Sequence, residues 1–387
     1  MNLVLYRKYR PQRFSEVIGQ EHVVKTLTNA LSSGIISHAY LFSGPRGSGK
    51  TTLARLFAKS LNCGNRKEGE AEPCTKCSSC LEIAGNRSID LIEIDAASHR
   101  GIDEMKELVE GIKFSPTKSK YKVFIIDESH QLSKEASNAL LKTLEEPPSH
   151  AIFILATTEI HKMISTIVSR CQRFDFRRLT LEEIVKRLEI LSEKEKVKID
   201  KAALELIALN SRGALRDAEG LLGQAISFCG QDKEVTAEEI KNLLGLVEVG
   251  LVSRFCDFLS RKKAAEALDF INEITEKGSD LQEFTKSLIN YLRQALILKI
   301  MGPEATNHDI RGSEESGKMR RLSSSPTIIV GLTKEELEKL KNQAAGLQEN
   351  EIRRMIELFL DAENKMRYSS ILQLPLELAA IECASEA

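Results

Sequence analysis

The stretch of the sequence that most clearly could do chemistry is the run Gly44, Pro45, Arg46, Gly47, Ser48, Gly49, Lys50, Thr51 and Thr52. It fits the pattern G-x-x-x-x-G-K-[ST] without a mismatch. Glycines let successive backbone N–H groups turn toward phosphate oxygens, and a helix that starts there adds positive potential. We therefore predict a nucleotide-phosphate loop, in which Lys50 reaches the β- and γ-phosphates and Thr51 binds Mg²⁺. The alternative is a chance glycine-rich turn.

An acid pair, Asp127 and Glu128, follows the apolar run 122–127. Acids at the carboxyl end of a strand face the crevice in which open α/β sheets bind ligands. We predict that Asp127 holds Mg²⁺ and that Glu128 is the base that orients an attacking water. The alternative is an ordinary pair of surface acids.

Three further side chains could assist the transfer of a phosphoryl group. Thr157, next to Thr158, ends the apolar run 150–157, and a hydroxyl there could orient water or read the γ-phosphate. Arg170 follows on a predicted loop and could neutralise developing charge. Arg216, near the start of a predicted helix, could reach back to the nucleotide. Taken alone, each has a plainer interpretation, as a strand-ending threonine or a solvated arginine.

Four of the eight cysteines are clustered: Cys63, Cys74, Cys77 and Cys80. Four thiols with two short spacings favour a tetrahedral Zn²⁺ site, and a full thiolate set leaves no open position for catalysis. We predict a structural zinc site that orders an otherwise polar segment. An iron–sulfur cluster, disulfides and free thiols are the alternatives.

The elements that must position these residues alternate between strands and helices up to about residue 178. We predict strands at 39–43, 88–95, 122–127, 150–157 and 172–176, and helices at 51–61, 101–112 and 133–146, the last with Ser133 as its N-cap. Apolar strands that alternate with amphipathic helices indicate a parallel sheet covered on both faces.

Beyond residue 178 the pattern becomes helical. A capping box at Thr180 and Glu183 and another at Thr236 and Glu239 mark helix starts. We predict four parts: an α/β nucleotide-binding domain at 1–178, a helical lid domain at 179–243, a helical domain at 244–378 and a tail at 379–387. The segment 312–327, rich in serine and charge, is predicted as an exposed loop.

The composition of the chain limits its partners and its location. The 387 residues carry a net charge of −1, so any contact with nucleic acid must come from a local patch or from an assembly. The N-terminus lacks the apolar core of a signal peptide, and no run of 18 apolar residues occurs. We predict a cytoplasmic protein without membrane contact.

Together these motifs resemble the gamma/tau family of clamp-loader ATPases of bacterial DNA polymerase III, within the AAA+ superfamily. The resemblance is strong over residues 1–243 and weaker to about 378. The stretches that carry it are 6–23, 38–52, 123–148, 153–176, 213–226 and the four-cysteine insertion.

The resemblance implies roles for several residues. Arg170 would act in trans on the ATP of a neighbouring subunit, Thr157 would be the first sensor and Arg216 the second. Residues around the adenine and ribose would be Tyr6, Arg7, Arg10, Val17 and Ile18. The third domain would form an oligomerising collar, and Arg100 and Lys142 are candidate contacts to the DNA backbone.

The resemblance also implies an activity: an ATP hydrolase, with ATP, Mg²⁺ and Zn²⁺ as cofactors, that opens a sliding clamp and loads it onto primed DNA. Implied partners are delta- and delta-prime-type subunits, further copies of the chain, the clamp and primer-template DNA. The chain would belong to the polymerase holoenzyme without a polymerase site of its own. Because it stops at residue 387, near the end of the predicted collar, it resembles the short family form or a lineage that lacks the further C-terminal domains.

Two other functions compete with this reading. A branch-migration ATPase of the same superfamily would carry a winged-helix domain at its C-terminus, which the helical pattern of 244–378 does not favour. A scaffold that binds ATP without hydrolysing it would not need the acid at Glu128.

Overall fold

The computed structural model describes residues 4–98, 111, 112, 114–230, 234–244, 249–302 and 334–384. The chain forms two compact units, Met1–Ala237 and Glu238–Ala387. Arg100, the loop predicted at 312–327 and all but the end of the helix predicted at 101–112 lie outside the described residues.

A five-stranded parallel sheet forms the centre of the first unit, with the strand order β2-β3-β4-β1-β5. The strands are β1 (Ala39–Ser43), β2 (Leu91–Asp95), β3 (Lys122–Asp127), β4 (Ala151–Thr157) and β5 (Gln172–Asp175). The predicted parallel α/β sheet is confirmed, although β2 starts three residues later than the predicted 88. Because all five strands are parallel, their carboxyl ends lie along one edge of the sheet.

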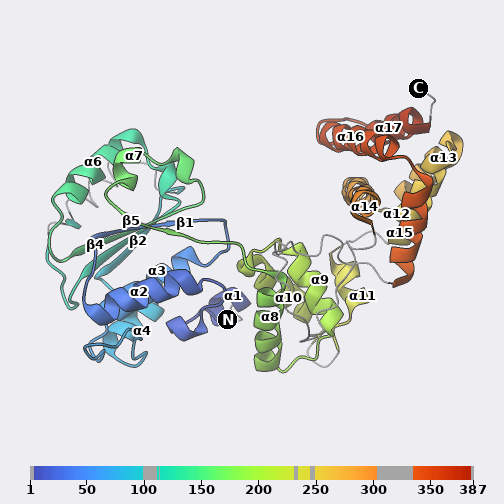
Figure 1. Cartoon of the computed structure of the whole chain (residues 1–387). Coiled ribbons are helices and arrows are strands. Elements are labelled where there is room, and N and C mark those ends of the chain that lie inside the picture. Colours follow the sequence, from blue (N-terminus) through green and yellow to red (C-terminus); the bar gives the residue numbers. More distant parts are fainter. Residues whose placement is uncertain are drawn as a thin grey trace, which may run out of the picture. The chain divides into compact units, whose positions relative to one another are not determined.

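Helices cover both faces of this sheet, as Figure 1 shows. One layer contains α2 (Glu21–Ser33), α3 (Lys50–Leu61) and α4 (Ser78–Ala84), and the other contains α6 (Lys134–Glu145) and α7 (Ser165–Val168). All five residues of β1 are buried. Alternation along that strand sends Tyr40 and Phe42 into the core beneath α2 and α3, and Leu41 into the core beneath α6.

Local sequence signals explain one helix in each layer. Ser133 caps α6 as predicted, because its hydroxyl accepts a hydrogen bond from the Ala136 N–H at 3.1 Å. The helix α2 was not predicted. Its signal was the four-residue spacing of Val23, Leu27 and Leu31, which all lie buried on one face.

Further helices of the first unit lie outside the sheet and its two covering layers. Short helical turns are α1 (Leu5–Lys8), η1 (Phe14–Glu16), η2 (Ser129–Gln131) and η3 (Ile160–Lys162). The longer helices are α8 (Leu181–Glu195), α9 (Lys201–Asn210), α10 (Leu215–Cys229) and α11 (Ala237–Leu243), of which the last extends into the second unit. The predicted capping box at Thr180 and Glu183 is present at the start of α8.

The described part of the second unit is helical around one apolar core. It contains α12 (Val249–Ser260), α13 (Ala264–Glu276), α14 (Leu281–Met301), α15 (Lys334–Gly346), α16 (Glu349–Met366) and α17 (Leu374–Ala384). Phe255 stacks on Phe270 and meets Phe284 edge-on. The predicted tail boundary at residue 379 falls inside α17, where Ala380 is buried. The division of the chain into an ATPase domain, a lid and a collar remains a prediction.

Asp90 fixes the start of β2 against the segment that leads into β3. Its buried carboxylate accepts hydrogen bonds from the backbone N–H groups of Thr117, Lys118 and Ser119 at 2.7–2.9 Å. Burial raises the pKa of Asp90, but the three N–H donors outweigh burial and hold the pKa below its ordinary value. The ionised carboxylate therefore stabilises the fold.

We expect Asp90→Asn to lower the free energy of unfolding of the first unit by about 2 kcal/mol at pH 7, because buried N–H groups lose a charged acceptor. The folded-state pKa is depressed, so this contribution is full above the unfolded pKa of about 4 and disappears as the pH falls through the folded value. Urea unfolding between pH 7 and pH 3 measures both effects. Asp200→Asn is the control, since Asp200 is exposed and its side chain caps no helix. An equal loss of stability at pH 7 and pH 3 would contradict this role for Asp90.

Candidate functional site

The predicted phosphate loop connects β1 to α3, at the carboxyl edge of the sheet. Gly47 and Gly49 have φ angles of 75° and 98°, in the left-handed region where glycine carries no steric penalty. Gly49 is also the N-cap of α3, so no side chain caps the first turn of that helix. The N–H groups of that turn are thus available to an anion.

Lys50 lies buried at the base of this loop. Its ammonium group donates hydrogen bonds to the carbonyl oxygens of Gly44 and Pro45 at 2.8 and 2.9 Å. Burial lowers the pKa of Lys50, and the carboxylates of Glu128 and Asp127 oppose that shift. The loop therefore holds a positive charge within its own backbone, close to the two predicted acids.

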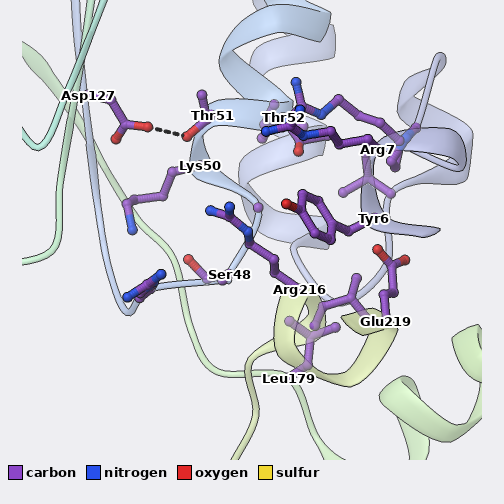
Figure 2. Close-up of a pocket in the computed structure, with 18 of the residues that line it drawn as sticks. Tyr6, Arg7, Ser48, Lys50, Thr51, Thr52, Asp127, Leu179, Arg216 and Glu219 are labelled. Atoms are coloured by element: carbon purple, nitrogen blue, oxygen red, sulfur yellow. Dashed lines mark hydrogen bonds between the residues drawn. The ribbon is translucent and has the colours of Figure 1, made fainter. Parts of the chain in front are cut away.

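Asp127 meets the phosphate loop directly. The Thr51 hydroxyl donates a hydrogen bond to Asp127 Oδ2 at 2.7 Å, drawn as a dashed line in Figure 2. Asp127 ends β3 and pairs in register with Asp95 of β2. A hydroxyl and a carboxylate side by side are oxygen ligands of the kind that Mg²⁺ prefers, so these residues fit the predicted magnesium site.

Glu128 follows with a φ of 46°, which is uncommon for a residue with a side chain. Its Oε2 accepts a hydrogen bond from the Thr158 hydroxyl at 2.8 Å. Thr157, the predicted first sensor, has no hydrogen bond to Glu128 and does not line the cavity described in the next paragraph. It is fully buried, and its hydroxyl lies 3.0 Å from His130 Nδ1 and accepts the Glu159 N–H. Thr158 is thus the threonine that reaches the acid pair.

A cavity of about 530 Å³ extends from the phosphate loop to the lid helices. Predicted residues on its wall are Tyr6, Arg7, Arg10, Val17, Ile18, Arg46, Gly47, Ser48, Gly49, Lys50, Thr51, Thr52, Asp127, Glu128 and Arg216. Gly44, Pro45, Thr157 and Arg170 are predicted site residues that do not line it. The structure therefore brings together most of the predicted nucleotide contacts, which come from four separate stretches of the chain.

The cavity wall also contains residues that the sequence reasoning missed, above all a buried ion pair. Arg187 Nε lies 2.9 Å from Glu219 Oε1, and both side chains are more than nine-tenths buried. Burial raises the pKa of Glu219 even though Arg187 opposes the shift. The two residues lie on α8 and α10, and nothing in their separation of 32 positions signals the contact.

Arg216 and Arg170 occupy different surroundings. The Arg216 guanidinium carbon lies 4.7 Å from the centre of the Tyr6 ring, on the cavity wall. Arg170 is one-third exposed, donates to the Thr166 carbonyl at 2.9 Å and pairs with Glu145 at 2.6 Å. Its position on the surface leaves it accessible to a neighbouring molecule. Lys142, a candidate DNA contact, is exposed on α6.

The four clustered cysteines converge as predicted. Their sulfur atoms all lie within 4.8 Å of one another, with 4.0 Å between Cys63 and Cys77 and 3.9 Å between Cys74 and Cys80. Zinc–sulfur bonds of about 2.3 Å in a tetrahedron place the sulfurs about 3.8 Å apart, so the group fits a single metal ion. None of these cysteines forms a disulfide.

Backbone N–H groups support the thiolate form of one of these cysteines. The N–H groups of Lys76 and Cys77 point at Cys74 Sγ and lower the pKa of its thiol to about 6. The same segment reaches the pocket side of the domain, because the Glu72 carboxylate accepts the N–H groups of Phe14 and Ser15 at 3.0 and 2.9 Å. The cysteine module, residues 63–80, therefore contacts the N-terminal segment just before Val17 and Ile18.

The fold and the site define a class of protein: a P-loop protein of the AAA+ type, with a parallel sheet, a phosphate loop after β1, acids after β3 and a helical lid. Three family models match consecutive parts of the chain. They are "DNA polymerase III, delta subunit" over 19–180, "DNA polymerase III clamp loader subunit, ATPase lid domain" over 183–231 and "DNA polymerase III subunits gamma and tau domain III" over 235–330.

Curated relatives narrow the class to a family. DNA polymerase III subunit tau of Bacillus subtilis is 48% identical over 76% of this chain and 52% of its own length. Subunit gamma/tau of Mycobacterium tuberculosis is 38% identical over 97% of this chain and 61% of its own. Subunit gamma of Buchnera aphidicola is 41% identical over 75% of this chain and 79% of its own. The chain belongs to the DNA polymerase III gamma/tau family.

The chain covers only part of some of these relatives. It spans about half to three fifths of the length of the tau and gamma/tau proteins named above. Within the described residues, no helix is both long and apolar enough to cross a membrane.

We expect Cys77→Ser to lose the bound metal. Zinc measured by mass spectrometry should fall from about one equivalent per chain toward zero, and the melting temperature should fall by several degrees, because the ion orders the segment. Cys171→Ser is the matched control, since Cys171 lies outside the cluster and burial raises its thiol pKa to about 12. Retention of a full equivalent of zinc by Cys77→Ser would contradict the assignment.

Proposed function

We propose that this chain is an ATP-hydrolysing subunit of a bacterial clamp loader, which uses ATP to open a sliding clamp and place it on primed DNA. The observation that carries the proposal is the Thr51–Asp127 hydrogen bond, which joins the phosphate loop to the acid strand at one end of the cavity. Membership of the gamma/tau family supports it, because the relatives are named as subunits of DNA polymerase III.

The nucleotide would lie along the cavity from the lid to the phosphate loop. The backbone N–H groups at Gly47 and Gly49 and the Lys50 ammonium group would bind the phosphates. Thr51 and Asp127 would hold Mg²⁺, which supplies charge neutralisation when bound. At the other end the base and ribose would meet Tyr6, Arg10, Val17 and Ile18, which line the same cavity.

The residues beside the γ-phosphate would orient the attacking water. Glu128 would be the base, and Thr158 would position it through the 2.8 Å hydrogen bond. We therefore transfer the first-sensor role from Thr157 to Thr158. Arg216 would act as the second sensor, because it belongs to α10 of the lid and lines the cavity.

Arg170 would complete the ATP site of a neighbouring subunit. Its exposure and its distance from the cavity of its own chain favour a role in trans. To act there, its guanidinium would exchange the Glu145 carboxylate for a phosphate, a partner with more negative charge. The chain would work with delta- and delta-prime-type subunits and further copies of itself.

The remaining parts of the proposal follow from the family. The cysteine module would bind Zn²⁺ as a structural ion, the helical second unit would contribute to the collar, and the sliding clamp and primer-template DNA would be the substrates of the assembly. We place this activity in the cytoplasm. The described residues of the second unit are all helical, which supports a clamp loader over a branch-migration ATPase with a winged helix.

We expect Lys50→Ala and Arg170→Ala each to reduce clamp- and DNA-stimulated ATP hydrolysis by about a thousandfold in the assembly with partner subunits. Arg170→Ala should still bind ATP, whereas Lys50→Ala should not. Mixing the two variants should restore part of the activity, because an intact Arg170 on one protomer meets an intact Lys50 on the next. Phosphate release measures the rates, and Lys186→Ala is the control, since Lys186 is an exposed cation of α8 outside the cavity and outside the predicted site. Failure of the mixture to recover any activity would contradict the trans role, and normal hydrolysis by Lys50→Ala would contradict the proposed function.

We expect the two adjacent threonines to behave differently. Thr158→Val should lower kcat by about tenfold or more, because it frees the Glu128 carboxylate from its donor. Thr157→Val should mainly lower the melting temperature, and it should lower kcat less than Thr158→Val does. The reason is that the Thr157 hydroxyl makes the buried contact with His130. Steady-state kinetics and thermal unfolding of both variants make the comparison. A larger loss of kcat in Thr157→Val would return the sensor role to that residue.

A further inference from the structure

Tyr6 and Arg216 are 210 positions apart, yet they form one contact on the wall of the cavity. The guanidinium carbon of Arg216 lies 4.7 Å from the centre of the Tyr6 ring, within the range of a favourable cation–π contact. Figure 2 shows the Arg216 side chain beside Tyr6, on the side that faces Ser48 and Lys50. The ring and the phosphate loop therefore flank the same positive charge.

The helix that carries Tyr6 is attached to the lid. Leu5 is buried, and its side chain lies against Gly223 of α10. The Arg187 guanidinium donates to the Tyr9 carbonyl at 2.6 Å, and Lys8 pairs with Glu195 of α8 at 2.7 Å. Contacts on both sides of Tyr6 thus hold α1 on the helices that also carry Arg216. The Tyr6 ring and the Arg216 guanidinium are therefore held in place by the same lid helices.

Arg216 differs from the other lid arginine on the cavity wall. Arg187 is neutralised by Glu219 at 2.9 Å. For Arg216, the described part of the chain records no ion pair with a carboxylate; its guanidinium lies over the ring of Tyr6 and also donates a hydrogen bond to the Tyr6 hydroxyl. A ring face restrains a guanidinium without cancelling its charge, so Arg216 keeps a full charge for an anion.

We propose that Tyr6 is a positioning residue for Arg216. Its ring restrains the guanidinium beside the phosphate loop, so that an incoming triphosphate meets a cation whose orientation is already set. The inference rests on the proposed function and differs from the role that family resemblance gives Tyr6, which is contact with adenine. In the proposed role Tyr6 contacts the Arg216 side chain, so replacing Tyr6 should change turnover only when Arg216 is present.

The test is a double-mutant cycle on ATP hydrolysis in the assembly with partner subunits, clamp and primed DNA. Tyr6→Leu removes the ring and should lower kcat by about fivefold to tenfold, whereas Tyr6→Phe keeps the ring and should stay within about twofold. Arg216→Ala should lower kcat at least as much as Tyr6→Leu. The double variant Tyr6→Leu, Arg216→Ala should be no slower than Arg216→Ala alone, because the ring acts through the guanidinium.

Tyr9→Leu is the matched control. Tyr9 is an aromatic residue of the same segment, its ring lies near Lys8 and Lys194, and it does not line the cavity. If Tyr6→Leu lowers the melting temperature more than Tyr9→Leu does, Tyr6→Met replaces it, because methionine fills more of the volume without a flat ring.

Three results would overturn the inference while the proposed function stands. They are losses that multiply in the double variant, an unchanged kcat in Tyr6→Leu, and a Tyr6→Leu effect on KM alone, as expected of a residue that only contacts adenine. Absence of ATP hydrolysis by the unaltered chain in the same assembly would instead contradict the proposed function itself, so the two failures are distinguishable.

Discussion

The contact between Thr51 and Asp127 is the constraint on which the rest of the site depends. It joins the first turn of α3 to the end of β3, although β4 lies between β3 and β1, the strand that leads into the loop. The contact is possible because parallel strands in register bring every carboxyl end to one edge. Asp90 and its three N–H donors keep β2 and β3 in that register, so a structural carboxylate at one end of the sheet maintains the chemistry at the other.

The N-terminal segment connects two parts of the first unit beside this site, the cysteine module and the lid. Glu72 of the cysteine module holds Phe14 and Ser15, while Arg187 of the lid holds the Tyr9 carbonyl. Between those anchors, Arg10 and Pro11 line the cavity. The cysteine module and the helical lid therefore both hold the segment that contributes to one wall of the cavity.

The cations of the site are each restrained by a local partner. Lys50 donates to two carbonyl oxygens of its own loop, Arg216 lies over the Tyr6 ring, and Arg170 pairs with the exposed Glu145. None of these partners is as good an acceptor as a triphosphate, since carbonyls and a ring carry no full charge and the Glu145 pair is weakened by solvent. Lys50, Arg216 and Arg170 are thus kept oriented without a buried carboxylate partner, in contrast to Arg187, which pairs with Glu219.

The sequence by itself determined the phosphate loop, the acid pair, the cysteine ligands and the strands, because each is a contiguous run whose chemistry depends on near neighbours. Only the tertiary structure decided which threonine serves Glu128. Thr157 is the last residue of β4 and shares the parity of Phe153 and Leu155, which pack under α6, whereas Thr158 lies beyond the strand, where its hydroxyl reaches Glu128. The pairs Arg187–Glu219 and Tyr6–Arg216 likewise required the fold, because helices distant in sequence meet only after the lid has packed.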